Sequence, residues 1–192
     1  HYDGETAQLF SRNLEDVTDS LPEVVDFVEA SLEVPAILDG EVVAVGTEGE
    51  PLPFQEVLRR FRRKHDVAAA REDVAVELYA FDCLHVDGED LLDVPLKRRH
   101  ERLRERFEAA AVDLTVSDDP DAIAELEAEA ISAGHEGIML KNPESTYTPG
   151  KRGRNWLKRK PDVETLDLVV TGAEWGEGRR ANLFGTFVVS AR

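Results

Sequence analysis

The stretch that most restricts how this chain can fold is residues 136–160, which read EGIMLKNPESTYTPGKRGRNWLKRK. An apolar run ends at Lys141, and Trp156 and Leu157 open a second stretch that continues with basic residues, with prolines and glycines between the two. Short apolar runs separated by such residues are typical of strands joined by a loop. We therefore predict strands over residues 136–141 and 155–160.

The second of these strands is expected to carry two basic side chains on one face. Alternate residues of a strand point to the same side, so Lys158 and Lys160 should point together. With Glu136 and Lys141 on the neighbouring strand, they would suit a phosphate chain and its metal ion. Taken alone, each fragment also fits a blander interpretation, namely a solvated basic face and an ordinary strand.

The charge balance disfavours a nucleic-acid partner at first sight. The 192 residues include 40 acids and 23 bases, for a net charge of -17, which repels a phosphate backbone. The bases are clustered, however, at residues 59–64 and again at 151–160, where no acid occurs. An acid-rich, lysine-poor composition is also typical of proteins adapted to a salt-rich cytoplasm, where charge repulsion is screened.

Other global features point to a soluble, cytoplasmic protein. There is no apolar run of membrane-spanning length and no signal-like start, so no membrane partner is expected. The single cysteine, Cys83, excludes an internal disulfide and lies in an apolar strand pattern, where we expect it to be part of the core.

Periodicity predicts helices and strands in both parts of the chain. The helices expected are residues 21–34, with Ser20 as cap and Pro22 in the first turn, then 53–64 with its arginines outward, 96–110 and 120–134. The further strands expected are 5–10, 36–45, 74–86, 166–175 and 183–190. Asp39-Gly40 is alternatively a hairpin turn, and Pro161 is expected to mark a domain boundary.

Motifs in a fixed order resemble the ATP-dependent DNA ligases, and archaeal ones most closely. They are SRNLEDVT (11–18), ILDGEVVAV (37–45), ELYAFDCLHVDG (77–88), EGIMLK (136–141) and NWLKRK (155–160). The acidic composition further suggests a halophilic archaeon. The closing sequence from residue 168 to 190 resembles the start of the oligonucleotide-binding (OB-fold) barrel that follows in that family.

The resemblance implies an α+β fold. We expect a nucleotidyltransferase domain, ATP-grasp-like, of two antiparallel sheets with flanking helices over residues 1–161. The first strands of an OB-fold barrel would follow over residues 162–192.

The implied reaction is ATP-dependent sealing of nicks in double-stranded DNA, serving replication, repair and recombination. A lysine takes the adenylyl group from ATP, the group passes to the 5′-phosphate of the nick, and the 3′-hydroxyl displaces AMP. Such chemistry depends on positioning and charge neutralisation, with Mg²⁺ or another divalent metal. The implied enzyme acts as a monomer, with a sliding clamp as a partner through regions outside this chain.

The resemblance also implies roles for particular residues. Glu136 and Glu41 would bind the metal, Glu41 on the ribose side. Phe81 would stack on adenine, although without the motifs it is better interpreted as a core residue. The residues implied in phosphate binding are Lys158 before all, then Lys160, Arg12, Arg152 and, more weakly, Lys141.

One element of the family pattern is missing. The family's nucleophile lies in a Lys-x-Asp-Gly motif, and no lysine of this chain is followed by that pattern. His1-Tyr2-Asp3-Gly4 imitates it but lies too close to Ser11, so these residues are expected to form a hairpin tip. We expect the nucleophile upstream of this chain, which by itself should not form the lysyl-adenylate.

Two alternatives to a DNA ligase remain open from the sequence. RNA ligases and capping guanylyltransferases share the chemistry and the motif order. A non-catalytic nucleic-acid-binding module would use the basic clusters alone, but it would leave Glu41, Phe81 and Glu136 without a role.

Overall fold

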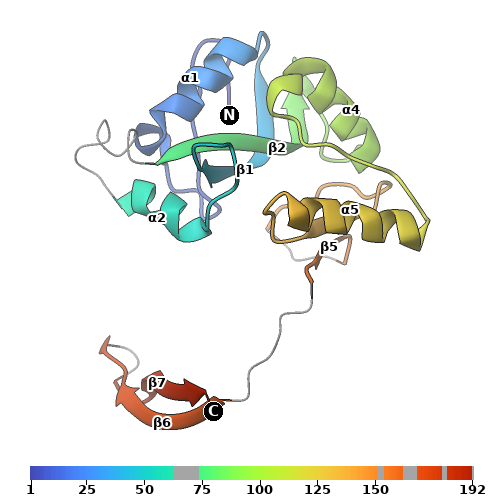
Figure 1. The fold of residues 1–192 in the computed structure, drawn as a ribbon. Helices are drawn as coiled ribbons and strands as arrows, with labels where there is room; N and C mark the ends of the chain where they lie inside the picture. The colour runs from blue at the N-terminus through green and yellow to red at the C-terminus, as the bar shows by residue number, and fades with distance from the viewer. Residues whose placement is uncertain (63–73, 151–153, 162–167, 179–180, 192) are drawn as a thin grey trace. The chain divides into compact units, whose positions relative to one another are not determined.

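The computed structural model describes residues 1–62, 74–150, 154–161, 168–178 and 181–191. The chain divides into two compact units, His1–Lys160 and Pro161–Arg192. Figure 1 shows the elements of each unit. Each unit is described by itself.

The first unit is built on a three-stranded antiparallel sheet of β1 (Ala36–Val45), β2 (Ala75–Val86) and β3 (Glu89–Asp90), in that order. The Asp87-Gly88 turn joins β2 to β3, and both of its residues have positive φ, as is common for Asp-Gly in a hairpin turn. At Gly40 strand β1 continues through a register shift, so the hairpin alternative is wrong. A side chain there would lie 2.8 Å from the Tyr79 carbonyl oxygen.

Helices α1 (Pro22–Ser31) and α4 (Leu96–Phe107) bury their apolar faces against this sheet (Figure 1). Leu103 of α4 and Ala80 of β2 are fully buried, and Cys83 is 1% exposed, which confirms its place in the core. A short 3-10 helix, η2 (Glu108–Ala110), follows α4. The chain then returns to β2, where Val112 N donates to the Ala80 carbonyl at 2.9 Å.

Two predictions near the N-terminal end are wrong. Residues 5–10 form only isolated bridges, because two of their amides are taken by side chains: Ala7 N donates to Glu29 Oε1 at 2.8 Å and Leu9 N to Thr18 Oγ1 at 3.0 Å. Ser20 does not cap α1. It lies instead in a 3-10 turn, η1 (Thr18–Ser20), that leads into the helix.

Helix α2 (Phe54–Arg62) confirms the helix predicted at 53–64, as far as the structure describes it, but not the outward placement of all its arginines. The Arg60 side chain is 1% exposed, lies 2.6 Å from Glu23 Oε1 and donates to the Val74 carbonyl at 2.7 Å. Its partners come from residues distant in sequence, so helical periodicity could not reveal them. Arg63 and Lys64 of the predicted basic cluster lie outside the described residues.

A second antiparallel sheet pairs β4 (Ile138–Lys141) with β5 (Trp156–Arg159). It confirms both strands predicted from the 136–160 stretch, with shorter bounds. Helix α5 (Pro120–Ser132) packs against β4 and is capped by Asp119, whose side chain accepts a hydrogen bond from the Asp121 amide. The α+β class is thereby confirmed, with small antiparallel sheets and flanking helices.

The second unit is a hairpin of β6 (Leu168–Trp175) and β7 (Phe184–Ala191). Many of its apolar side chains are exposed, including Trp175 at 67% and Phe184 at 51%, and these two rings stack with centroids 4.6 Å apart.

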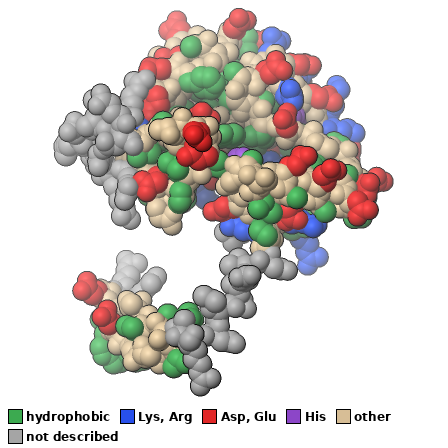
Figure 2. All heavy atoms as spheres, in the orientation of Figure 1, with side chains coloured by type: hydrophobic (Ala, Val, Ile, Leu, Met, Phe, Trp, Pro, Cys, Tyr) green, Lys and Arg blue, Asp and Glu red, His purple; other side chains and the backbone are tan. Residues whose placement is uncertain are grey.

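Among the described residues, no helix has the length and apolar character needed to cross a bilayer. Figure 2 shows acidic side chains scattered over the face in view, in keeping with the net charge of -17.

Candidate functional site: an aromatic corner beside a basic strand

Phe81 of β2 and Trp156 of β5 form what we call the aromatic corner. Their ring centroids are 5.7 Å apart and their planes meet at 80°. Lys141, the last residue of β4, places its Nζ atom 3.8 Å from the Trp156 centroid and 4.4 Å from the Phe81 centroid. The corner therefore joins the two sheets and holds an ammonium group against both rings.

A buried ion pair fixes the segment next to Phe81. Arg99 of α4 and Asp82 of β2 are both fully buried, with Nε donating to Oδ1 at 2.7 Å and Nη2 to Oδ2 at 2.8 Å. Arg99 Nη1 also donates to the carbonyls of Val94 at 2.5 Å and Ser145 at 3.0 Å. Such full pairing is what makes a buried guanidinium tolerable. Arg99 thus ties β2 to the loop that follows β4.

A second contact, between half-buried side chains, holds that same loop. Tyr147 Oη donates to Asp39 Oδ2 of β1 at 2.7 Å, and Arg99 lies 5.7 Å from the centroid of the Tyr147 ring. Burial raises the pKa of the Asp39 carboxyl, although the bond from Tyr147 opposes that shift. Burial and the bond to Asp39 raise the pKa of the Tyr147 hydroxyl as well.

Arg99, Asp82 and Tyr147 were not predicted from the sequence. A signal for Arg99 was present, because it shares a helical face with the apolar residues Leu96 and Leu103 at spacings of three and four. A cation at such a position requires a buried partner. Nothing in the local sequence indicates that Asp82 is that partner.

Lys141 is perturbed by the same surroundings. Burial lowers the pKa of its ammonium to about 8, against the opposing influence of Asp82 and Asp39. A lysine with a pKa this close to neutrality is held in its charged form only weakly. Its burial distinguishes Lys141 from Lys158 and Lys160, which are exposed.

Glu136, Lys158 and Lys160 form the basic end of the site, and all three are exposed. Glu136 Oε2 accepts from Lys160 Nζ at 2.5 Å and from Lys158 Nζ at 3.2 Å. These hydrogen bonds lower the pKa of Glu136 and raise that of Lys160. The predicted common direction of the two lysines is confirmed, since both reach the same carboxylate oxygen.

Gly137 explains why the acid is followed by glycine. Its φ is +137°, and a Cβ atom there would lie 2.2 Å from the Arg159 carbonyl oxygen. Only glycine lets the chain pass β5 this closely. The turn at Gly137 is therefore what brings Glu136 beside the lysines of β5.

Residues of the aromatic corner and of the basic end lie along one face of the second sheet. Lys141 pairs with Trp156 and Met139 with Lys158, and residues directly opposite in an antiparallel pair share a face. The opposite face carries Arg159, whose Nε donates to Glu127 of α5 at 2.7 Å. The face with Trp156 and Lys158 thus offers an aromatic end and a basic end about 7 Å apart, two residues along the strand.

The remaining predicted residues are not joined to these groups. Glu41 lies exposed on β1 opposite Tyr79, and Arg12 is exposed in a turn closed by Ser11 N donating to the Glu15 carbonyl at 2.8 Å. Among the described residues, no hydrogen bond or ion pair links either side chain to the aromatic corner or to Glu136. Arg152 lies outside the described residues.

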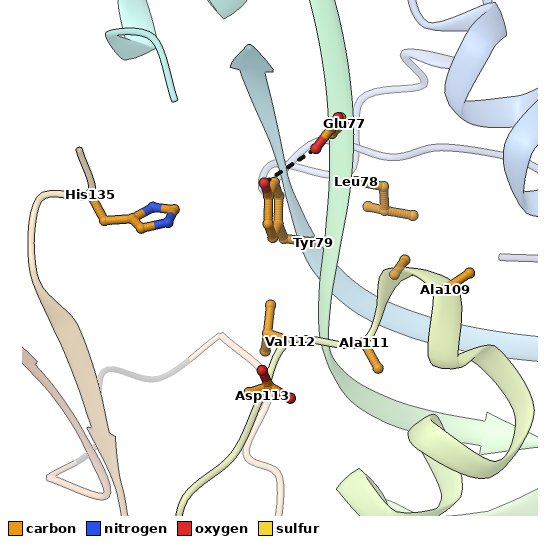
Figure 3. Close-up of a pocket in the computed structure, with 9 residues that line it drawn as sticks. Glu77, Leu78, Tyr79, Ala109, Ala111, Val112, Asp113 and His135 are labelled. Atoms are coloured by element: carbon orange, nitrogen blue, oxygen red, sulfur yellow. Dashed lines mark hydrogen bonds between the residues drawn. The ribbon is translucent and has the colours of Figure 1, made fainter. Parts of the chain in front are cut away.

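A hollow of about 410 Å³ lies elsewhere, beside the edge of β2 (Figure 3). Tyr79, which donates to Glu77 at 3.2 Å, faces His135 across it, and Val112 and Asp113 line its other side. Of the residues that the structure describes, none of those predicted to bind nucleotide lines it, and no described lysine or arginine does so either. A site without a cation suits a phosphate chain poorly, so we place the candidate site at the aromatic corner.

Acidic ligands for a metal are sparse at the candidate site. In the part of the chain that the structure describes, no group of three or more His, Cys, Asp or Glu side chains could hold a metal ion. Magnesium commonly takes only one or two carboxylates and completes its shell with water and substrate phosphates. Glu136 fits that mode, because its carboxylate lies where two ammonium groups would hold phosphate.

Comparison with known proteins decides the family. The family model described as the ATP dependent DNA ligase domain matches residues 1–160. The chain belongs to the ATP-dependent DNA ligase family. Curated relatives named DNA ligase are 77% identical in Natronomonas pharaonis and 68% identical in Haloarcula marismortui, each across 100% of this chain and 35% of the relative. The chain therefore spans about a third of the length of these relatives.

Solved structures place the fold in the same family. A mycobacterial DNA ligase D complexed with ATP and MES matches with a TM-score of 0.68 and 28% identity, over 98% of this chain and 56% of that one. A Lig E DNA ligase structure, at 20% identity and a TM-score of 0.66, supports the fold alone. The resemblance drawn from the motifs, including the likeness to ligases of halophilic archaea, is confirmed.

Proposed function

We propose that this chain forms the nucleotide-binding part of an enzyme that uses ATP to seal nicks in double-stranded DNA. The observation that carries the proposal is the shared face of β4 and β5, with Trp156 and Lys141 at one end and Lys158 at the other. An aromatic end and a basic end about 7 Å apart suit a base and the phosphate that follows its ribose. Family membership supports the same substrate.

The residues then divide the nucleotide between them. Phe81 stacks on the adenine, Lys158 contacts the α-phosphate, and Lys160 and Lys141 add positive charge nearby. Arg12 and Arg152 bind ATP phosphates or the phosphate of the nick, as guanidinium groups do well. Lowering the charge repulsion between phosphate oxygens is the main contribution that such groups make to phosphoryl transfer.

A divalent metal, Mg²⁺ or another, would be held by Glu136 with Glu41 on the ribose side. When bound, it would neutralise charge on the phosphates. Glu136 already accepts bonds from two lysines, which supports a site where carboxylate, metal and phosphate alternate in charge.

Several wider assignments belong to the same proposal. Residues 162–192 begin an OB-fold barrel, which the exposed apolar side chains of β6 and β7 support, because a barrel would cover them. The enzyme acts as a monomer in the cytoplasm on nicked DNA, in replication, repair and recombination. It contacts a sliding clamp through regions outside this chain.

The proposal is tested with α-labelled ATP and magnesium. This chain is compared with a version extended at its N-terminal end through the next Lys-x-Asp-Gly motif. We expect amine-linked label, stable to alkali and released by acid as a lysyl phosphoramidate should be, on the extended version alone, since no lysine here has that context. Label on neither protein, in salt that keeps the longer one folded, would reject the ligase activity. Labelling by GTP in place of ATP would instead favour capping chemistry.

A further inference from the structure

The aromatic corner is occupied by a cation of the chain itself. The Nζ atom of Lys141 lies 3.8 Å from one ring centroid and 4.4 Å from the other. Because the ring planes of Phe81 and Trp156 meet at 80°, one ammonium group can contact the faces of both. The quadrupole of each ring attracts it there.

The face of Phe81 under Lys141 is the one turned towards β4 and β5. Lys141 and Trp156 both belong to that sheet, and they share its face with Lys158. A base whose phosphates reach Lys158 must therefore stack on this same face of Phe81. The ammonium and the base would compete for one surface.

The rings, rather than a carboxylate, hold the ammonium in place. Lys141 forms no ion pair or hydrogen bond with the residues that the structure describes, whereas Lys158 and Lys160 are both paired with Glu136. The nearby carboxylates have partners of their own, Asp82 in Arg99 and Asp39 in Tyr147. Lys141 can leave the corner without breaking an ion pair.

We propose that Lys141 is a built-in competitor for the base site, which holds the aromatic corner until a nucleotide base displaces its ammonium group. The inference rests on the proposed function, because it names what regulates access to that site. Base binding is then weaker than the open corner would allow, by the strength of the contacts that Lys141 gives up.

Protonation should control this competition. Burial sets the pKa of Lys141 at about 8, so its ammonium is charged below that pH and largely neutral above it. A neutral amine loses the attraction to the rings. The charged groups that face it are Asp39 of β1, Asp82 of β2 and Arg99 of α4. Tyr147, the other ionisable neighbour of this cluster, has a raised pKa and stays neutral through the same range.

Adenosine is the probe of choice, because it stacks like ATP but carries no phosphate that would attract Lys141 elsewhere. Binding is followed by the fluorescence of Trp156 in a Trp175→Phe background, since the chain has two tryptophans. In the otherwise unaltered chain, we expect affinity for adenosine to rise roughly fivefold between about pH 7 and about pH 9. Lys141→Met should bind at the higher affinity at both pH values.

Lys97→Met is the matched control. Lys97 is an exposed lysine that is paired with Glu144, whereas Lys141 is the lysine that contacts the two rings. Lys97→Met should keep the pH dependence. The inference is overturned if Lys141→Met binds adenosine no better than the parent at pH 7, or if the parent shows no pH dependence. The pH series on the parent needs no substitution beyond Trp175→Phe, which lies in the second unit, so misfolding caused by a change at the site cannot obscure it.

A parallel titration with ATP distinguishes failure of the competitor proposal from failure of the proposed function. ATP binding together with pH-independent adenosine binding would reject the competitor and leave the proposed function standing. If neither ligand changed the fluorescence of Trp156 in any variant at either pH, the proposed function and the competitor would both be rejected.

Discussion

The two ends of the candidate site are built in opposite ways. Around the aromatic corner, Arg99 and Asp82 are fully buried and bound on every side by fixed partners. At the basic end, Glu136 is paired with Lys158 and Lys160, and all three side chains are exposed. The half-buried base end of the site thus rests on buried residues of the fold, whereas the phosphate end is a surface cluster subject to salt.

The difference indicates what each end contributes. Buried charges with several hydrogen bonds are costly to disturb, so they fix the position of Phe81 and of the loop after β4. Exposed charges contribute little to folding, because water and ions compete with them. They remain free to bind an incoming phosphate chain.

The largest loss of stability is expected when Arg99 is replaced. Arg99→Met leaves Asp82 buried without its partner, and we expect a loss of about 3–5 kcal/mol in the free energy of unfolding. Denaturant titration measures it. Arg98→Met, one residue earlier in an exposed pair with Glu101, is the control and should change stability by less than about 0.5 kcal/mol. Equal effects of the two substitutions would show that the buried network does not hold the fold.

The turn at Gly137, just before β4, is expected to require the backbone freedom of glycine. Gly137→Ala places a Cβ against the Arg159 carbonyl at a φ of +137°, so we expect a loss of about 1–3 kcal/mol. Gly88→Ala also has positive φ but meets no atom within 4 Å, and its loss should be the smaller of the two. Urea titration of both variants side by side decides the point, and the reverse order would contradict it.

Lys141 should make the free energy of unfolding depend on pH. Its folded pKa of about 8 lies below the ordinary value of 10.5, so the unfolded chain binds more protons between these values. The free energy of unfolding should therefore rise as pH increases from 8 towards 10.5, and the cost of burying the ammonium is fully present below 8. Lys141→Met should lack this rise, which thermal melting across the range would detect. Parallel pH profiles for parent and variant would exclude the burial cost.

The basic end should give the smallest effect on folding. Lys158→Met removes one of two exposed partners of Glu136, and we expect stability to stay within about 0.5 kcal/mol of the parent. Urea titration at low and at molar salt measures it. A clear destabilisation that persisted at high salt would mean that the basic end is not the loosely held surface described above.

The sequence predicted the parts of this site that depend on local pattern. Strands β4 and β5 and the common direction of Lys158 and Lys160 follow from the residue pattern, and the α+β class follows from the resemblance that the motifs carry. The bulge at Gly40 and the amides of Ala7 and Leu9 bound by side chains were not predicted, because both depend on partners distant in sequence.

Buried polar contacts were the harder part to foresee. Arg60 was expected outside and is buried against Glu23, and Arg99 was not considered at all. Helical periodicity identifies the face on which a residue lies, but it does not identify the carboxylate that would make burial of a guanidinium favourable. The aromatic corner escaped prediction for the same reason, since Trp156 meets Phe81 only through the packing of two sheets.

The central claim is that ATP binds across both ends, with its base at the half-buried aromatic corner and its phosphates at the exposed basic end. ATP titration of the Phe81→Ala and Lys158→Met variants at low and at molar salt tests it most directly. We predict that Phe81→Ala abolishes binding at both salt concentrations, whereas Lys158→Met weakens it at low salt and by less at molar salt, where charge is screened. Unchanged ATP binding by Phe81→Ala would contradict the account.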